Sequence, residues 1–336
     1  MRTTRGIAIV SLGIVLCHAA VAFSATGAPD AILCAVTGKV SVQNPQGKVQ
    51  YVTGNTPLRA GDRVFAGANS RASVIFPNRP PQEVRAGQSL LIEATAAARS
   101  AAANSPALTR LWSTVVARFR SCFLTERQAP PAVSRDLDGV GVPRLLSPCW
   151  TAIPETQPVF RWTGVAGAQS YLLTVLSRTG RQTFTRVVEG TECAVPSEVA
   201  PLTAGELYVW CVADAAQPEE VSRGAWFRVL SSEQRDAYDE SLAALNAIYA
   251  ADPPQRAELA GYLAADYGLN VLAAQALETA LQARPDDVAI RRTLARVYEA
   301  MERGEQAVKV LEGLSPVPVE QQNAWSAVAT GGAPTP

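Results

Sequence analysis

Histidine is almost absent from this chain. Its 336 residues include one histidine, His18, which lies in an apolar segment close to the start. If that segment is removed, no imidazole remains, which excludes nucleophilic triads with a histidine base and zinc sites with a histidine ligand. Glycine-rich phosphate loops of the G-x-x-x-x-G-K-[ST] type are also missing. The sequence therefore predicts a protein that is not an enzyme and that has no cofactor or metal.

An enzyme that works with two carboxylates alone remains an alternative. The adjacent acids Glu219-Glu220 and Asp286-Asp287 are the pairs that such chemistry would need. Both pairs stand beside predicted turns, where acids favour solvent and helix N-termini. We therefore assign neither pair a catalytic role.

The chain also has no excess of either charge, with 30 basic and 30 acidic residues. Nucleic-acid binders need a net basic face that displaces counterions from phosphates. The sequence accordingly predicts no nucleic-acid partner.

The first residues have the three parts of a secretory signal peptide. Arg2 and Arg5 precede an apolar run from 7 to 22, and small residues up to Ser24 offer a cleavage site. We expect residues 1–24 to be removed and the mature protein to be periplasmic or extracellular. The alternative is a retained segment that would tether the protein to the membrane.

Five cysteines remain after the predicted cleavage, and an oxidising compartment makes them candidates for disulfides. They are Cys34, Cys122, Cys149, Cys193 and Cys211. The number is odd, so at most two bridges can form within the chain, and no pair has the C-x-x-C spacing of a redox motif. The sequence leaves the pairing open.

Residues 30–94 alternate apolar and polar positions in short runs separated by glycines, which predicts a small all-β domain. The stretch contains Gly38-Lys-Val-Ser-Val, then Leu58 with Gly61-Asp62, then the strand Ala72-Ser-Val-Ile-Phe76. On these motifs it resembles a FecR-type domain. It departs from that family after Phe76, where Pro77-Asn-Arg-Pro-Pro81 replaces the usual hairpin, and it lacks the preceding cytoplasmic segment, so the sigma-regulator role is not transferred.

Residues 95–148 are expected to be a linker that contains one amphipathic helix. Apolar side chains recur at helical spacing between Leu108 and Phe119, and prolines and glycines follow from 129 to 148. We expect the helix to pack on a neighbouring domain.

Residues 149–230 predict a second β domain of five or six short strands. The motif Pro158-Val-Phe-Arg-Trp162 and the strand Tyr171-Leu-Leu-Thr-Val175 resemble fibronectin type III-like domains, which implies a β-sandwich. In the later run ending at Val212, alternation would point Tyr208 and Trp210 into the core and Cys211 to the opposite face.

Residues 231–315 change to helical periodicity with an internal repeat. Gly261 and Ala295, like Ala273 and Ala307, stand 34 residues apart, the period of tetratricopeptide repeats, which this segment resembles. That resemblance implies a concave groove that binds a peptide or protein. The candidate groove residues are Tyr262, Asp266, Arg291 and Tyr298.

The remaining residues, 316–336, are rich in Pro, Gly, Ala and Gln, and we expect a disordered tail. The predicted fold class is therefore multidomain, β plus α: a FecR-like domain, a fibronectin type III-like sandwich and a C-terminal helical repeat. The predicted function is protein–protein interaction or scaffolding in the cell envelope, with an envelope protein or peptide as partner. The alternative partner is cell-wall glycan or another polysaccharide.

Overall fold

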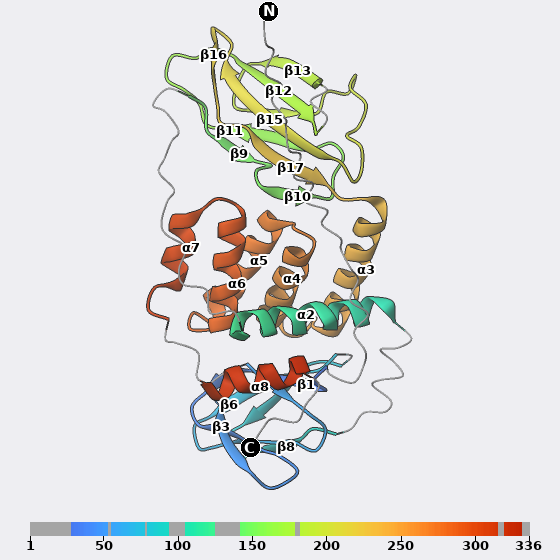
Figure 1. Cartoon of the computed structure of the whole chain (residues 1–336), viewed down its shortest axis with the longest axis vertical. Helices are drawn as coiled ribbons and strands as arrows, with labels where there is room; N and C mark the ends of the chain where they lie inside the picture. Colours follow the sequence, from blue (N-terminus) through green and yellow to red (C-terminus); the bar gives the residue numbers. More distant parts are fainter. Residues whose placement is uncertain are drawn as a thin grey trace, which may run out of the picture.

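The computed structural model describes residues 28–52, 55–77, 79–93, 105–124, 142–178, 182–314 and 319–330. The predicted signal peptide lies outside these residues, as do half of the predicted linker and the side chain of Cys122. Figure 1 shows three layers along the longest axis: a sandwich of strands, a layer of helices, and the β domain formed by the N-terminal strands.

The N-terminal β domain consists of two four-stranded antiparallel sheets, ordered β4-β1-β6-β7 and β3-β2-β5-β8. Alternating residues such as Val40, Val64 and Val74 fill the core between them. The strands are β1 (Ala31–Thr37), β2 (Val40–Gln43), β3 (Val49–Val52), β4 (Thr56–Leu58), β5 (Arg63–Ala66), β6 (Arg71–Ile75), β7 (Gln82–Arg85) and β8 (Ser89–Leu91).

Strand β1 is buried on both of its faces. Ala31 and Leu33 point into the core of the N-terminal β domain, whereas Ile32 and Cys34 join the core of the helices. An unbroken apolar run is what a strand covered on both sides requires. The start of β1 therefore already contains the docking surface for the helical layer.

The second β domain is a sandwich of two sheets, ordered β14-β11-β9 and β10-β17-β15-β12-β13, with β16 added beside β15. Its strands are β9 (Leu145–Ser147), β10 (Thr151–Ile153), β11 (Val159–Trp162), β12 (Tyr171–Ser177), β13 (Gln182–Val188), β14 (Glu192–Ala194), β15 (Leu207–Asp214), β16 (Gln217–Val221) and β17 (Ala225–Val229). Strand β9 belongs to the sandwich, so this domain begins before the expected residue 149.

The aromatic residues that the sequence placed in the core of the sandwich lie there as predicted. Tyr208, Trp210 and Val212 are buried, while Cys211 lies on the other face of β15. The hydroxyl of Tyr208 accepts a hydrogen bond from the backbone N–H of Thr203 at 2.8 Å, which fixes the turn before β15 in the manner of a tyrosine corner.

The helical domain consists of α2 (Pro106–Leu124), α3 (Ser232–Ile248), α4 (Pro253–Asp266), α5 (Asn270–Ala283), α6 (Val288–Ala300), α7 (Gly304–Leu311) and α8 (Val319–Thr330). Helix α3 begins at a capping box, in which Ser231 and Gln234 each bind the other's backbone N–H. Within the described residues, no helix is both long and apolar enough to cross a membrane.

The helical domain extends beyond its predicted bounds, 231–315, at two places. The helix placed in a linker, α2, has Leu111, Val115 and Phe119 buried in the core of the helical domain. The tail expected to be disordered contains α8, whose Trp325 is fully buried. Both helices lie between the repeats and the N-terminal β domain (Figure 1), because their apolar side chains need both neighbours for burial.

Candidate functional site

The candidate site is the face of the repeats formed by their first helices, α4 and α6. Helices α4 and α5 approach closely because residue 261 is a glycine: a β-carbon there would lie 2.6 Å from Leu277 Cγ. Ala295, Ala273 and Ala307 are buried at the other small positions of the repeat. The small residues therefore have the packing role that the period predicted.

Helix α2 covers this face. It packs against α3, α4 and α6, and Figure 1 shows it running across them. The ring of Phe119 meets the ring of Tyr262 edge to face, with centroids 5.5 Å apart and planes inclined by 82°. The first-helix face is thus filled by a helix of the same chain.

Polar contacts fix α2 along its length. Arg110 forms an ion pair with Glu240 of α3 at 2.8 Å. The hydroxyl of Thr114 donates to Asp266 at 3.1 Å, and Arg296 of α6 donates to the hydroxyl and the backbone carbonyl of Ser121 at 2.6 and 2.7 Å. Together with the buried apolar side chains, these contacts make α2 an integral part of the helical domain.

The four predicted groove residues do not form one open surface. Tyr262 is fully buried and Tyr298 is 7% exposed. Arg291 donates to the backbone carbonyls of Pro285 and Glu312. Asp266 is half exposed, and its carboxylate also lies 3.5 Å from Arg118 of α2. Asp266 is the most exposed of the four and Arg291 is partly exposed, but Arg118 and Thr114 of α2 contact the carboxylate of Asp266.

A buried polar network lies where the repeats meet β1. The carboxylate of Glu258 is fully buried and accepts hydrogen bonds from Gln255 and Tyr262, each at 2.7 Å, and from the guanidinium of Arg284. The thiol of Cys34 donates to Gln255 at 3.4 Å. Burial raises the pKa of Glu258, and the nearby positive charge of Arg284 opposes that rise. The network joins the first strand of the chain to the first repeat.

A second polar contact ties the N-terminal β domain to the end of the chain. The backbone carbonyl of Asn55 accepts hydrogen bonds from the indole N–H of Trp325 and the amide of Gln321, each at 3.0 Å. The side chain of Asn55 donates to Asp287, which also caps α6. Residues far apart in the sequence therefore share one interface.

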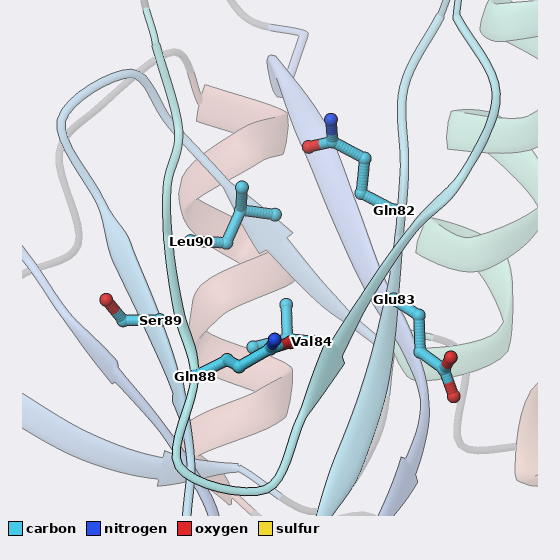
Figure 2. Close-up of a pocket in the computed structure, with 6 residues that line it drawn as sticks. All are labelled: Gln82, Glu83, Val84, Gln88, Ser89 and Leu90. Atoms are coloured by element: carbon cyan, nitrogen blue, oxygen red, sulfur yellow. The ribbon is translucent and has the colours of Figure 1, made fainter.

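The N-terminal β domain has a hollow of about 490 Å³ between β7 and β8, which belong to different sheets. Figure 2 shows the side chains that line it. Ser89 and Leu90 point to opposite sides of β8. The lining residues are Gln82, Glu83, Val84, Gln88, Ser89 and Leu90. Glu83 is the one acidic residue among those that line the hollow, so this hollow does not contain the pair of carboxylates that the alternative enzyme would need.

The four cysteines whose side chains are described are free thiols. Cys34 and Cys149 are buried, and burial raises the pKa of both, that of Cys149 to about 12. Cys193 and Cys211 are partly accessible. No disulfide joins any two of these four, and Cys122 lies outside the described side chains. The described part of the chain also contains no cluster of three metal-ligating side chains.

Comparison with known families identifies the helical segment. Residues 264–330 match the family model described as tetratricopeptide repeat. This confirms the predicted repeat for that segment and supports a role in protein–protein interaction or scaffolding. The match runs from the end of α4 through α8, so it includes residues that we expected to be disordered.

Other comparisons add little. One solved structure, described as "Biofilm associated protein - BSP domain", is 13% identical, with a TM-score of 0.20 over 61% of this chain and 26% of that one. This chain therefore spans about a quarter of that structure's length, and the TM-score is too low to support an argument about the fold. The search of curated proteins gives no match.

The sequence interpretation missed what covers the first-helix face. The apolar stripe from Leu111 to Phe119 is wide enough for a helix with several neighbours, and Trp325 is a large aromatic residue in a segment otherwise poor in apolar side chains. Those two signals could have identified α2 and α8 as core helices. Nothing in the sequence pairs Glu258 with Arg284, because that contact joins two helices.

Proposed function

We propose that this chain is an exported, non-enzymatic scaffolding protein of the cell envelope. The observation that carries the proposal is the single hydrophobic core that contains β1, α2, the repeats and Trp325 of α8. A repeat whose first-helix face is filled from within serves to hold the chain's own domains in place. Partner proteins then bind to the faces that the β domains present.

The attachment of the sandwich supports the same role. The backbone N–H of Ala152 donates to the carbonyl of Gly268 at 2.7 Å, and the amide of Asn270 donates to the carbonyl of Trp150 at 2.7 Å. Arg223 forms an ion pair with Glu302 at 2.9 Å. These contacts fix one end of the sandwich on the turn between α4 and α5 and on the end of α6.

The FecR-like and fibronectin-like resemblances and the signal-peptide pattern support the envelope location. The absence of histidine after residue 18 supports a non-enzymatic role, because it removes the commonest general base. Cell fractionation with mass measurement of the purified protein tests the location. We expect a periplasmic or secreted protein that lacks about 24 N-terminal residues; an intact chain in the cytoplasm would contradict the proposal.

Limited proteolysis tests the scaffold. A protease can cut the chain between the N-terminal β domain, α2 and the repeats. We expect the resulting fragments of wild-type protein to stay associated as one stable complex. Separation of the N-terminal β domain from the repeats in native buffer after such a cleavage would contradict a permanent shared core.

A second function, glycan binding, is favoured by one feature of the N-terminal β domain. On the outward face of the sheet β3-β2-β5-β8, the register aligns Tyr51, Ser41, Phe65 and Ser89 in one row. Tyr51 is 75% exposed, and the two aromatic rings are two strands, about 10 Å, apart. Aromatic rings alternating with hydroxyls suit a sugar chain, whose rings combine C–H faces with hydroxyl rims.

Co-sedimentation with purified peptidoglycan tests the second function. We expect a Y51A/F65A variant to lose at least tenfold in binding if the row is the site. The control is Q50A, which changes the same strand on its other face. Equal binding by the two variants would exclude this row as a glycan site.

A further inference from the structure

The larger sheet of the sandwich breaks the alternation expected of a sheet with one face in water. Inward residues of β12 and β15, such as Leu173 and Trp210, fill the core. Most of the outward residues between them are also apolar, including Leu172, Leu176 and Val209. Antiparallel sheets with one solvated face normally place polar residues there. This outward face therefore has the composition of a surface that is covered.

Strand register arranges the outward residues in three rows. One apolar row contains Val187, Leu172, Ala213 and Val221, and the other contains Leu176, Val209 and Trp226. Between them lies a row of small polar side chains, Thr185, Thr174 and Cys211. We call these ten residues the outer face. None of them is charged.

Part of the outer face is exposed to solvent in the single chain, although Ala213 is only 3% exposed. Val187 is 58% exposed, Val221 46% and Val209 37%. Figure 1 shows β12, β13 and β15 at the end of the molecule, with β10 and β17 between them and the helices. Arg228 follows Trp226 on the same side of β17 and donates to the carbonyl of Tyr267, so this cation is turned toward the helical domain. Exposed apolar surface of this size is often functional.

We propose that the outer face binds the same face of a second copy of this chain, forming a two-fold symmetric dimer. The two-fold axis runs along the middle row. Rotation about that axis places one apolar row on the other apolar row of the copy, and each residue of the middle row on itself. The order apolar, small polar, apolar is therefore self-complementary, as a closed two-fold interface requires.

Charge and shape favour a copy over a charged partner. In a symmetric dimer, a charge near the axis would meet the same charge on the copy and be repelled. The ten residues of the outer face carry no charge, so they neither repel a copy nor attract a charged partner. Two sheets can stack face to face about 10 Å apart with their strands nearly aligned. Four strands over five residues cover roughly 300 Å², less than the about 800 Å² per partner of a standard interface. The dimer is accordingly weak and dissociates on dilution.

The geometry of the proposed dimer also determines how the two Cys211 residues can be cross-linked. The axis passes close to this residue, so the two Cys211 side chains face each other across the stacked sheets. Backbones about 10 Å apart are too distant for a disulfide, which needs Cα atoms within about 7 Å. A short bifunctional maleimide spans the gap. We expect this reagent to join two chains through Cys211 and expect C211S to abolish the product.

Sedimentation velocity of the mature full chain over a range of concentrations tests the proposal. The test variant is V209K, which puts a lysine into an apolar row. Its matched control is V159K, since Val159 is also 37% exposed but lies on β11 of the opposite sheet. We expect wild type and V159K to dimerise alike and V209K to dimerise at least tenfold more weakly, with all three showing the same circular dichroism.

Three results would overturn the proposal. Wild-type protein that stays monomeric at its highest soluble concentration excludes the dimer. If V209K and V159K weaken the dimer equally, an added charge anywhere on the sandwich has the same effect, and the outer face is not the interface. If the chain is monomeric and binds a different protein, and V209K loses that binding while V159K keeps it, the outer face is assigned to that other protein. The scaffolding function is judged by proteolysis, so either hypothesis can fail alone.

Discussion

The ring of Phe119 in α2 stacks on the indole of Trp325 in α8, with centroids 5.9 Å apart and planes inclined by 9°. The same phenylalanine meets Tyr262 of α4 edge to face. One side chain thus joins the helix that precedes the sandwich in the chain, the first repeat and the last helix. Both aromatic partners are fully buried, so this contact stands at the centre of the shared core.

Replacing Phe119 by alanine should lower the free energy of unfolding by about 3–5 kcal/mol, because a fully buried aromatic ring leaves a cavity between three helices. Urea denaturation followed by circular dichroism measures the change. The control is S113A, an exposed position of the same helix. A loss below about 1 kcal/mol would show that α2 is not part of the core.

Trp325 should contribute in two separable ways. W325F keeps a ring for stacking but loses the hydrogen bond to the Asn55 carbonyl, and should cost about 1 kcal/mol for that bond and more where the smaller ring leaves space. W325A should cost about 3–5 kcal/mol. In a double-mutant cycle with F119A, we expect a coupling of about 0.5–1.5 kcal/mol. Fully additive losses would argue against direct stacking.

Substitution of Gly261 by alanine tests the close approach of α4 and α5. Helix propensity alone should favour alanine by about 1 kcal/mol, but the new β-carbon would overlap Leu277, and overpacking costs about 1–3 kcal/mol. We expect a net loss of up to about 2 kcal/mol, measured by thermal or urea unfolding. The loss should disappear in an L277A background, where the overlapping atoms are gone; persistence there would place the cost elsewhere.

The buried carboxylate of Glu258 should make stability depend on pH. Because burial raises its folded-state pKa above the ordinary value of 4.5, its contribution to stability is fully present below that value. The contribution is lost as pH rises through the folded pKa. Unfolding free energies measured from about pH 4.5 to pH 8 should therefore fall with pH from this group, and E258Q should remove that part of the slope.

Removing the cation sharpens the same prediction. R284M should cost about 3–5 kcal/mol near neutral pH, because it leaves Glu258 charged and buried without its partner. The loss should shrink as pH falls and Glu258 takes up a proton. In E258Q/R284M, which has neither charge, we expect a smaller loss that does not vary with pH; a loss as large as in R284M would assign it to packing.

Thiol accessibility should divide the cysteines into two groups. In native protein a maleimide should modify Cys193 and Cys211 first, since both are partly accessible. Cys34 and Cys149 should react only on unfolding, because both are buried and burial raises the pKa of each thiol. Peptide mass spectrometry over time gives the order. Early labelling of Cys34 would contradict its place between β1 and the repeats.

Local patterns were sufficient to predict much of the fold. Alternation placed Trp210 in the sandwich core and Cys211 on its outer side, and the period of 34 residues predicted the repeat that the family comparison confirms. Each of these features depends on residues close in the chain. The groove residues were harder to predict, because Tyr262 and Tyr298 lie on the expected helices but the sequence does not say what covers them.

The sequence by itself determined the β and α segments and the repeat, because strand alternation, helix periodicity and small residues at close contacts are local requirements of packing. Only the tertiary structure decided that α2 covers the first-helix face, that α8 closes the core with Trp325 and that Glu258 pairs with Arg284. An amphipathic helix reveals that it needs a partner but not which one. That choice depends on the fit of side chains from segments more than a hundred residues apart.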